Sequence, residues 1–176
     1  MSELLDEIEV LLRKGEIERA FGLVKDKDTD SLAGGLIERI IFHIKNEEYD
    51  FAGTYFEFLE KIAIDNGIKE KERKHLANAY LNCGNAYAKK KDFDRAIEDY
   101  KKAIKFNPEY AGAYYNRGLA YGKKGKFDNA IEDYNKAIGF NPDFADAYTN
   151  RGSAYNAKED FDRAIEDYKK GNRFKS

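Results

Sequence analysis

AGAYYNRGLAYGKKGKFDNAIEDYNKAIGFNPDF, residues 111–144, is the stretch of sequence that decides the fold. The preceding residues, 77–110, match it at 22 of 34 positions without a gap, and the following residues, 145–176, match it at 18 of 32. Self-similarity at a fixed period of 34 residues indicates a stack of helical hairpins rather than a closed globule. We therefore predict an all-α repeat protein, for which a binding scaffold is the leading functional hypothesis.

The pattern inside this repeat predicts two antiparallel helices. Apolar residues recur at helical spacing in two runs, which are separated by Lys123-Lys124-Gly125-Lys126. Short helices approach closely only where side chains are small, so we expect Gly118 on the first helix to meet Ala130 on the second. Asn141-Pro142 closes the repeat, and we expect these two residues to be the N-cap and the first residue of the next helix.

At seven positions the repeat resembles the tetratricopeptide repeat (TPR) family. Residues 111–144 carry Tyr114, Gly118, Tyr121, Ala130, Tyr134, Ala137 and Pro142 at these positions. Residues 77–110 have the same residue types, at Tyr80, Gly84, Tyr87, Ala96, Tyr100, Ala103 and Pro108. Residues 145–176 match at Tyr148, Gly152, Tyr155, Ala164 and Tyr168, but have Gly171 in place of alanine and Ser176 in place of proline. The resemblance implies a right-handed superhelix of helical hairpins.

The first 67 residues carry weaker copies of the same repeat. The alanine at the position of Ala130 recurs at Ala20 and Ala52. Residues 68–76, IKEKERKHL, contain no helix breaker, so we expect them to extend the following helix at its front. The predicted organisation is thus a degenerate TPR-like part, residues 1–67, and a part led by this extended helix, residues 68–176. The second part holds three regular repeats, 77–110, 111–144 and 145–176, and the whole chain is expected to form about ten helices in five hairpins.

The composition argues against several classes of protein. The 31 basic and 33 acidic residues nearly balance, whereas a nucleic-acid-binding protein would be clearly basic. No apolar run is long enough to span a membrane, and the N-terminal MSELLDEIEV lacks the basic and apolar regions of a signal peptide. The single cysteine, Cys83, excludes an internal disulfide framework and fits a reducing compartment. We expect a cytoplasmic protein that binds neither nucleic acid nor membranes.

Catalysis has little support in the sequence. His43 falls where the repeat carries an aromatic side chain, so we interpret it as a packing residue, and His75 lies in a charged run. No cysteine–histidine cluster has zinc spacing, and no phosphate-binding or dinucleotide-binding motif occurs. The adjacent Glu132 and Asp133 point apart on a helix, unlike a catalytic carboxylate pair. We expect neither an enzyme nor a bound cofactor or metal.

The resemblance implies that the first helix of each repeat lines a concave groove that binds a partner. The corresponding residues here are Asn78, Leu81, Asn82, Asn85, Lys89, Tyr115, Asn116, Leu119, Lys123, Asp146, Thr149, Asn150, Ser153 and Asn156. Three of these asparagines, Asn82, Asn116 and Asn150, recur at the repeat period. One interpretation is that these asparagines form a ladder that binds the backbone of a peptide. The other is that they recur only because asparagine is common in this repeat.

One subgroup of the family binds the C-terminal carboxylates of heat-shock chaperones through two asparagines, two lysines and an arginine. Asn85 and Asn116 match the two asparagines, but Leu81, Asp146 and Asn150 replace the cationic residues. We therefore do not expect that activity.

Two arginines and a set of lysines have other expected roles. Arg117 and Arg151 occupy a usually apolar position, and we expect each to pair with a carboxylate such as Asp133 or Asp167. The lysines at the hairpin turns would form a solvated basic rim, with the alternative that they steer an acidic partner.

The functional hypothesis is a protein–protein interaction scaffold whose concave groove binds a peptide or helical segment of another protein. The alternative is a self-assembly module in which open repeat ends pair. Apolar residues near the C-terminal edge, Ile165, Tyr168 and Phe174, favour such a homo-oligomer because no further repeat follows them in this sequence.

Overall fold

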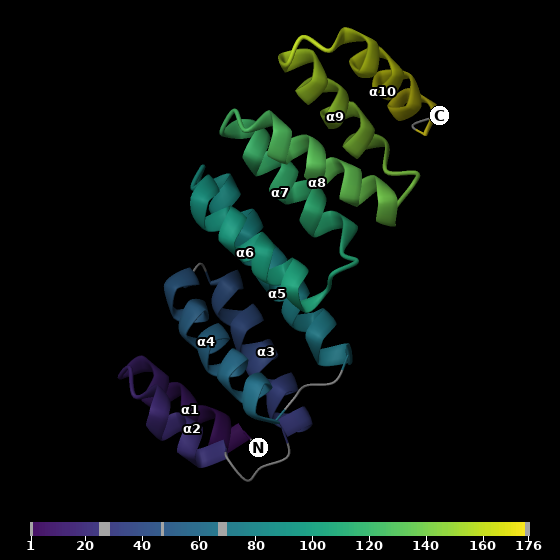
Figure 1. The fold of residues 1–176 in the computed structure, drawn as a ribbon. Helices are drawn as coiled ribbons and strands as arrows, with labels where there is room; N and C mark the ends of the chain where they lie inside the picture. The colour runs from purple at the N-terminus through teal and green to yellow at the C-terminus, as the bar shows by residue number, and fades with distance from the viewer. Residues whose placement is uncertain (1, 25–28, 47, 67–69, 175–176) are drawn as a thin grey trace. The chain divides into compact units, whose positions relative to one another are not determined.

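The computed structural model describes residues 2–24, 29–46, 48–66 and 70–174. Ten α-helices make up almost all of these residues and follow one another as antiparallel neighbours (Figure 1). They are α1 (Ser2–Arg13), α2 (Ile17–Val24), α3 (Thr29–Lys45), α4 (Tyr49–Asn66), α5 (Glu70–Lys89), α6 (Phe93–Phe106), α7 (Ala111–Lys123), α8 (Phe127–Phe140), α9 (Ala145–Ala157) and α10 (Phe161–Arg173). The predicted all-α architecture of about ten helices in hairpins is confirmed.

Packing divides the chain into two compact parts, which we call the N-terminal unit (Met1–Ala79) and the C-terminal unit (Tyr80–Ser176). The division falls inside α5. This helix begins at Glu70, seven residues before the first regular repeat, so the predicted extension at its front is confirmed from that residue onward. Ile68 and Lys69, which were expected to belong to the same extension, lie outside the described residues.

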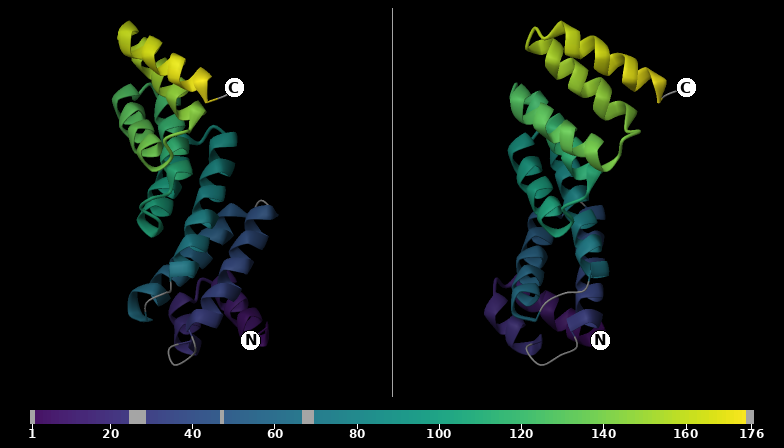
Figure 2. Two further views of the ribbon diagram at one scale, coloured as in Figure 1. Left: turned by 90° about the vertical axis from the view of Figure 1, so that its right-hand side faces the viewer. Right: turned by 45° about the vertical axis from the view of Figure 1, so that its right-hand side comes forward.

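The C-terminal unit consists of the three regular repeats as hairpins α5–α6, α7–α8 and α9–α10 (Figure 2). Each hairpin turn needs one residue in the left-handed backbone region, and this residue recurs at the repeat period. It is Lys91 (φ 63°), Gly125 (φ 72°) and Glu159 (φ 63°). Asp92 and Asp160 follow directly and cap the next helix, because their side chains accept hydrogen bonds from the backbone N–H groups of residues 95 and 163.

The expected role of Asn141 and Pro142 was wrong. Asn141 is the C-cap of α8, and its backbone N–H donates to the carbonyl of Ala137 at 2.9 Å. Helix α9 begins only at Ala145, after a short turn in which Phe144 N donates to Asn141 O at 3.1 Å. Proline here follows the end of a helix, which is the other position that its missing N–H favours.

Relief of the backbone strain at the hairpin turn should stabilise the C-terminal unit. A side chain at φ 63° costs of order 1 kcal/mol or more, whereas glycine adopts this region freely. We expect Glu159→Gly to raise the free energy of unfolding by about 0.5 kcal/mol after the entropic cost of glycine, and Gly125→Ala to lower it by about 1 kcal/mol. Urea denaturation of both variants measures this. If both variants changed the free energy of unfolding in the same direction, positive φ at these two turn positions would not be the source of strain.

The two helices of each repeat touch through a glycine and a tyrosine. A Cβ atom placed on Gly118 would lie 2.8 Å from Cε1 of the Tyr134 ring, and one placed on Gly84 would lie 2.6 Å from the equivalent atom of Tyr100. Gly118 is therefore a packing residue, as expected. However, the ring that lies on it is Tyr134, whereas the sequence pointed to Ala130. The glycine leaves room for an aromatic ring, and this ring fills the space between the helices.

Gly118→Val should destabilise the C-terminal unit by about 1–3 kcal/mol or more, because the added methyl groups push the buried Tyr134 ring off α7. The matched control is Gly139→Val on α8, where an added Cβ meets no atom within 4 Å. Thermal or urea denaturation should separate the two variants clearly. Equal stability of the Gly118 variant and the natural protein would show that Gly118 and the Tyr134 ring are not in close contact.

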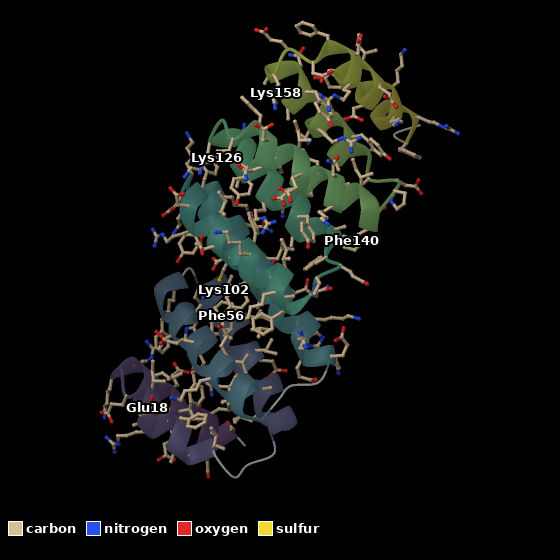
Figure 3. All side chains as sticks on the ribbon, in the orientation of Figure 1. Glu18, Phe56, Lys102, Lys126, Phe140 and Lys158 are labelled. Atoms are coloured by element: carbon tan, nitrogen blue, oxygen red, sulfur yellow. The ribbon has the colours of Figure 1, made fainter. Side chains whose placement is uncertain are left out.

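Consecutive repeats are joined by polar contacts that also recur every 34 residues, and we call this set the inter-repeat joint. Lys124 pairs with Asp94 of the preceding repeat, and Lys158, which is labelled in Figure 3, pairs with Asp128. Two turns away, Arg151 Nη1 donates to Asn135 Oδ1 at 2.5 Å, whereas the preceding joint has Lys101 at the position of Asn135. Lys124, one of the lysines expected in a solvated basic rim, thus forms an ion pair between repeats, and Lys158 does the same in the following repeat.

Candidate functional site

Two pockets of the C-terminal unit are each formed by three consecutive helices. The upstream pocket has a volume of about 420 Å³ and is lined by Asn85, Ala88, Lys89, Phe93, Tyr100, Asn116, Leu119, Ala120 and Lys123. The downstream pocket has a volume of about 170 Å³ and is lined by Leu119, Gly122, Lys123, Phe127, Ala130, Tyr134, Asn150, Ser153 and Ala154. The two pockets are adjacent because both include Leu119 and Lys123.

The two pockets are the same site repeated at the period of the sequence. Eight pairs of lining residues differ by 34 in number: Asn85 and Leu119, Ala88 and Gly122, Lys89 and Lys123, Phe93 and Phe127, Tyr100 and Tyr134, Asn116 and Asn150, Leu119 and Ser153, Ala120 and Ala154. In each pocket the second helix of one repeat provides aromatic residues and the first helix of the next repeat provides an asparagine. A repeated sequence thus builds a repeated recess.

A hydrogen-bond network fixes the polar wall of the upstream pocket. Asn85 Oδ1 accepts from the Tyr100 hydroxyl at 2.9 Å and from Asn116 Nδ2 at 2.8 Å. Burial, together with the negative charge of Asp99, raises the pKa of Tyr100, so this hydroxyl stays protonated and donates. The amides of Asn85 and Asn116 are therefore held in one orientation before any ligand binds.

The downstream pocket is smaller and less polar at the equivalent place. Leu119 occupies the position of Asn85 there, so the Tyr134 ring faces an apolar neighbour. Asn150 Nδ2 donates to the Tyr115 hydroxyl at 3.0 Å and to the backbone carbonyl of Asp146 at 2.8 Å. This asparagine is also held by neighbouring groups. The pair of pockets therefore combines fixed amides, aromatic surface and the exposed lysines Lys89 and Lys123.

Seven of the fourteen residues predicted for the groove line these pockets: Asn85, Lys89, Asn116, Leu119, Lys123, Asn150 and Ser153. Asn78 belongs to the N-terminal unit, on the other side of the packing division. Four others on α5 and α9 line neither pocket, namely the half-buried Leu81 and the exposed Asn82, Asp146 and Asn156. The predicted ladder therefore has two of its three members, Asn116 and Asn150, in equivalent pockets.

Tyr115 and Thr149, the remaining two predicted residues, pack inside the unit. The Tyr115 ring lies 4.6 Å from the ring of Phe144 and 6.0 Å from that of Tyr134. Thr149 donates to the carbonyl of Ala145 at 3.0 Å, and a Cβ on Gly171 would lie 2.6 Å from its hydroxyl oxygen. Gly171 replaces the usual alanine because Thr149 needs this space.

The sequence-based prediction missed the residues that the second helices contribute to the pockets. These are Phe93 and Tyr100 on α6 and Phe127, Ala130 and Tyr134 on α8. The available signal was the recurrence of phenylalanine at the start of each second helix. The family resemblance, in contrast, implied a groove lined by the first helices alone.

Arg117 and Arg151 form the expected ion pairs. Arg117 Nε and Nη2 donate to the two carboxylate oxygens of Asp133 at 2.8 and 2.6 Å, and Arg151 binds Asp167 in the same way at 2.7 and 2.6 Å. Both aspartates are buried. These are structural pairs between the two helices of a repeat.

The first regular repeat lacks this ion pair. Asp99 holds the position of Asp133, but Cys83 stands where the later repeats have arginine. Asp99 Oδ2 is buried and has no hydrogen-bond partner among the described residues. Burial raises the pKa of Asp99 to about 7, against the opposing charge of Lys102. Burial also raises the pKa of the Cys83 thiol, which makes this cysteine unreactive near neutral pH.

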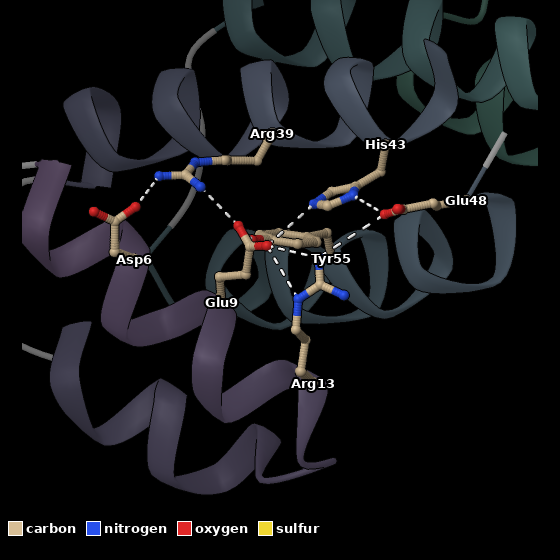
Figure 4. A network of polar contacts seen from close by, with 7 residues as sticks. All are labelled: Asp6, Glu9, Arg13, Arg39, His43, Glu48 and Tyr55. Atoms are coloured by element: carbon tan, nitrogen blue, oxygen red, sulfur yellow. Dashed lines mark hydrogen bonds and ion pairs between the residues drawn. The ribbon is translucent and has the colours of Figure 1, made fainter. Parts of the chain in front are cut away.

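A second group of polar residues lies in the N-terminal unit, around His43 (Figure 4). His43 is fully buried, with its ring stacked at 5.3 Å on that of Tyr55 and its Nδ1 at 2.6 Å from Glu48 Oε2. Glu9 Oε2 accepts from Tyr55 OH at 3.0 Å and from Arg39 Nη1 at 2.7 Å. The packing role expected for His43 agrees with this burial. Because these contacts tie α1 to α3 and α4, we interpret the network as structural.

Comparison with known proteins identifies the family. A family model described as TPR repeat matches residues 84–125, and one described as tetratricopeptide repeat matches residues 111–144 and 145–171. The chain belongs to the TPR family, whose members are typically non-catalytic scaffolds.

Solved structures agree with this assignment. The first TPR of Spaghetti (RPAP3), bound to the HSP90 peptide SRMEEVD, is 31% identical over 57% of this chain and 80% of that chain, with a TM-score of 0.57. A crystal structure of MamA is 29% identical over 94% of this chain and 92% of its own, with a TM-score of 0.63. The TPR domain of Arabidopsis OM64 is 27% identical over 58% of this chain and 84% of its own, with a TM-score of 0.57. The comparison with curated proteins found no match.

In the part of the chain that the structure describes, no cluster of three or more histidine, cysteine or acidic side chains could hold a metal ion. Over the same residues, every helix is too short or too polar to cross a bilayer.

Proposed function

We propose that this protein is a non-catalytic scaffold that binds an extended segment of another protein across the upstream and downstream pockets. The observation that carries the proposal is the register of the two pockets, which present the same aromatic, amide and lysine groups twice at adjacent places. An extended peptide offers side chains at regular intervals, so two of them can enter two such recesses. The fixed amides of Asn116 and Asn150 suit the polar backbone between these side chains.

Peptide binding by a related structure supports the proposal. The first TPR of Spaghetti is bound to a seven-residue HSP90 peptide that carries three acidic residues in its sequence SRMEEVD. This chain retains Asn85 and Asn116 but lacks the cationic residues of the carboxylate clamp at positions 81, 146 and 150. We therefore propose a ligand whose binding rests on apolar side chains in the pockets, with Lys89 and Lys123 adding a preference for acidic residues beside them.

Variants that fill the pockets test this function. A heptapeptide display library selected on the protein would supply the probe, and calorimetry would measure its affinity. We expect Ala88→Leu to fill the upstream pocket and Gly122→Leu the downstream pocket, and each should weaken binding at least tenfold. The matched control is Ala157→Leu, at an exposed position on α9 that lines neither pocket.

The thermal stability of all three variants should stay near that of the natural protein, which separates loss of binding from loss of the fold. Undiminished affinity of both pocket-filling variants for the selected peptide would refute the proposed site. Replacement of Asn116 and Asn150 by alanine should also weaken binding, because their amides are expected to hydrogen-bond the peptide backbone.

A further inference from the structure

The outer face of α10 exposes apolar residues whose counterparts in an earlier repeat are covered. Phe161 is 57% and Ile165 52% exposed, whereas Ile97, two repeats before Ile165, is only 6% exposed. In the views of Figure 2, α10 lies against α9, and no other described helix of the C-terminal unit covers its other side. Helices α6 and α8 occupy the same position in their repeats, and each is covered by the first helix of the following repeat.

The charged residues of the inter-repeat joint are also present on this face. Asp162 is the counterpart of Asp94 and Asp128, which pair with Lys124 and Lys158. Lys169 is the counterpart of Asn135, which accepts a hydrogen bond from Arg151. Both residues are exposed, and Asp162 forms no ion pair with any described residue. The outer face of α10 therefore carries the aspartate and the apolar residues of an inter-repeat joint, but not the lysine that pairs with this aspartate in the earlier joints.

Helix α1 exposes the matching half. The turn glycines Gly15 (φ 73°) and Gly125 (φ 72°) place α1 in register with α7. In this register Lys14 corresponds to Lys124, and Val10 corresponds to the buried Ala120. Val10 is nevertheless 50% exposed, and Lys14 is exposed as well. The third residue of this face is the exposed Glu7, the counterpart of Arg117 and Arg151.

We propose that α1 of one copy of this protein docks on α10 of a second copy and rebuilds the inter-repeat joint between them. Lys14 then pairs with Asp162 of the second copy, and Val10 covers Phe161 and Ile165. At the other end, Glu7 meets Lys169, so both charged pairs have opposite signs. The opposite signs of both charged pairs are what select a second copy as the occupant.

The docking is head to tail, since the two faces are different surfaces of the chain. Each bound copy leaves one free α1 and one free α10, so association does not stop at a symmetric dimer. Sedimentation velocity and light scattering should show a mass that continues to rise with protein concentration. Added salt should reduce the association, because the two charged pairs are exposed at the rim of the contact.

Charge reversal tests the proposal with two single variants. Lys14→Glu and Asp162→Lys each place like charges across the joint, and we expect each to weaken self-association about tenfold. A 1:1 mixture of the two variants should associate as strongly as the natural protein, because the reversed α1 of one variant meets the reversed α10 of the other. The matched control is Lys136→Glu, which reverses an exposed charge on α8 and changes the net charge by the same amount as Lys14→Glu.

Three results would overturn the proposal. One is a mass that stays at that of a single chain up to millimolar concentration. Another is a mixture of the two variants that associates no better than either variant alone. The third is an equal effect of the Lys136 control. Melting curves of the variants should match that of the natural protein, since the altered side chains are exposed.

Discussion

Arg117→Ala is expected to lower the free energy of unfolding by about 3 kcal/mol or more, because it leaves the carboxylate of Asp133 buried without its partner. Asp133 is only 3% exposed. Burial already raises its pKa, and the hydrogen bonds and charge of Arg117 oppose that rise. Without the arginine, the folded protein must either hold an unpaired buried charge or bind a proton there, and both cost free energy at neutral pH.

The pH dependence of this loss has a definite sign. The pKa of Asp133 in the folded variant lies further above its unfolded value of about 3.9 than in the natural protein. A group whose folded pKa is raised loses stability as the pH rises from the unfolded value toward the folded one. Urea denaturation should therefore show a larger cost of Arg117→Ala at pH 8 than at pH 5.

Two controls separate the buried pair from ordinary surface effects. Replacement of both partners, Arg117→Met with Asp133→Leu, removes the polar groups together and should restore most of the stability. Lys101→Ala breaks the exposed pair with Glu98 and should cost less than about 1 kcal/mol. If the double variant is as unstable as Arg117→Ala, the cost lies in lost packing rather than in the unpaired charge.

Asp99→Asn should stabilise the protein at pH 8 and flatten its pH dependence between about pH 4 and pH 7. Burial holds the pKa of Asp99 at about 7, roughly three units above an exposed aspartate. The folded state thus binds more protons than the unfolded state in this window, and stability falls as the pH rises through it. At about 1.4 kcal/mol per unit, the loss by pH 8 amounts to at most about 4 kcal/mol.

Cys83→Arg should also stabilise the protein at pH 8. The two later repeats carry arginine at this position, and each arginine binds both oxygens of its aspartate. We expect the new pair to lower the pKa of Asp99 and to raise stability at pH 8. Cys83→Leu serves as the control for added bulk without charge. Stability of the natural protein that stays level from pH 5 to pH 8 would show that Asp99 does not titrate as described.

The hairpins were predictable because their contacts are local and repeat in the sequence. A tyrosine ring on a glycine recurs in all three regular repeats, and an arginine beside an aspartate recurs in two of them, so the copies reinforce one interpretation. The role of Asn141 was not predictable in this way, because a proline fits both after one helix and at the start of the next. Its place depends on where the chain turns.

The pockets were only half predictable, for a different reason. A residue lines a pocket only where the neighbouring side chains leave its surface exposed. Some of these neighbouring side chains belong to the next repeat, so the pattern within one repeat does not show which residues remain exposed. Phenylalanine is a residue type that usually lies in a core, but Phe93 and Phe127 line the pockets. They do so together with residues from the first helix of the next repeat. Conversely, Tyr115 was expected to contact a partner, but its ring packs 4.6 Å from the ring of Phe144 inside the unit.

The inter-repeat joint also determines how the length of this protein can change. Each joint uses a lysine–aspartate pair at the same spacing, and this ion pair connects only adjacent repeats. A further copy of residues 111–144 inserted after position 144 would therefore find the aspartate of α8 for its lysine and offer its own aspartate to the lysine that follows α9. Such a duplication would lengthen the protein by one hairpin and add a third recess beside the existing two.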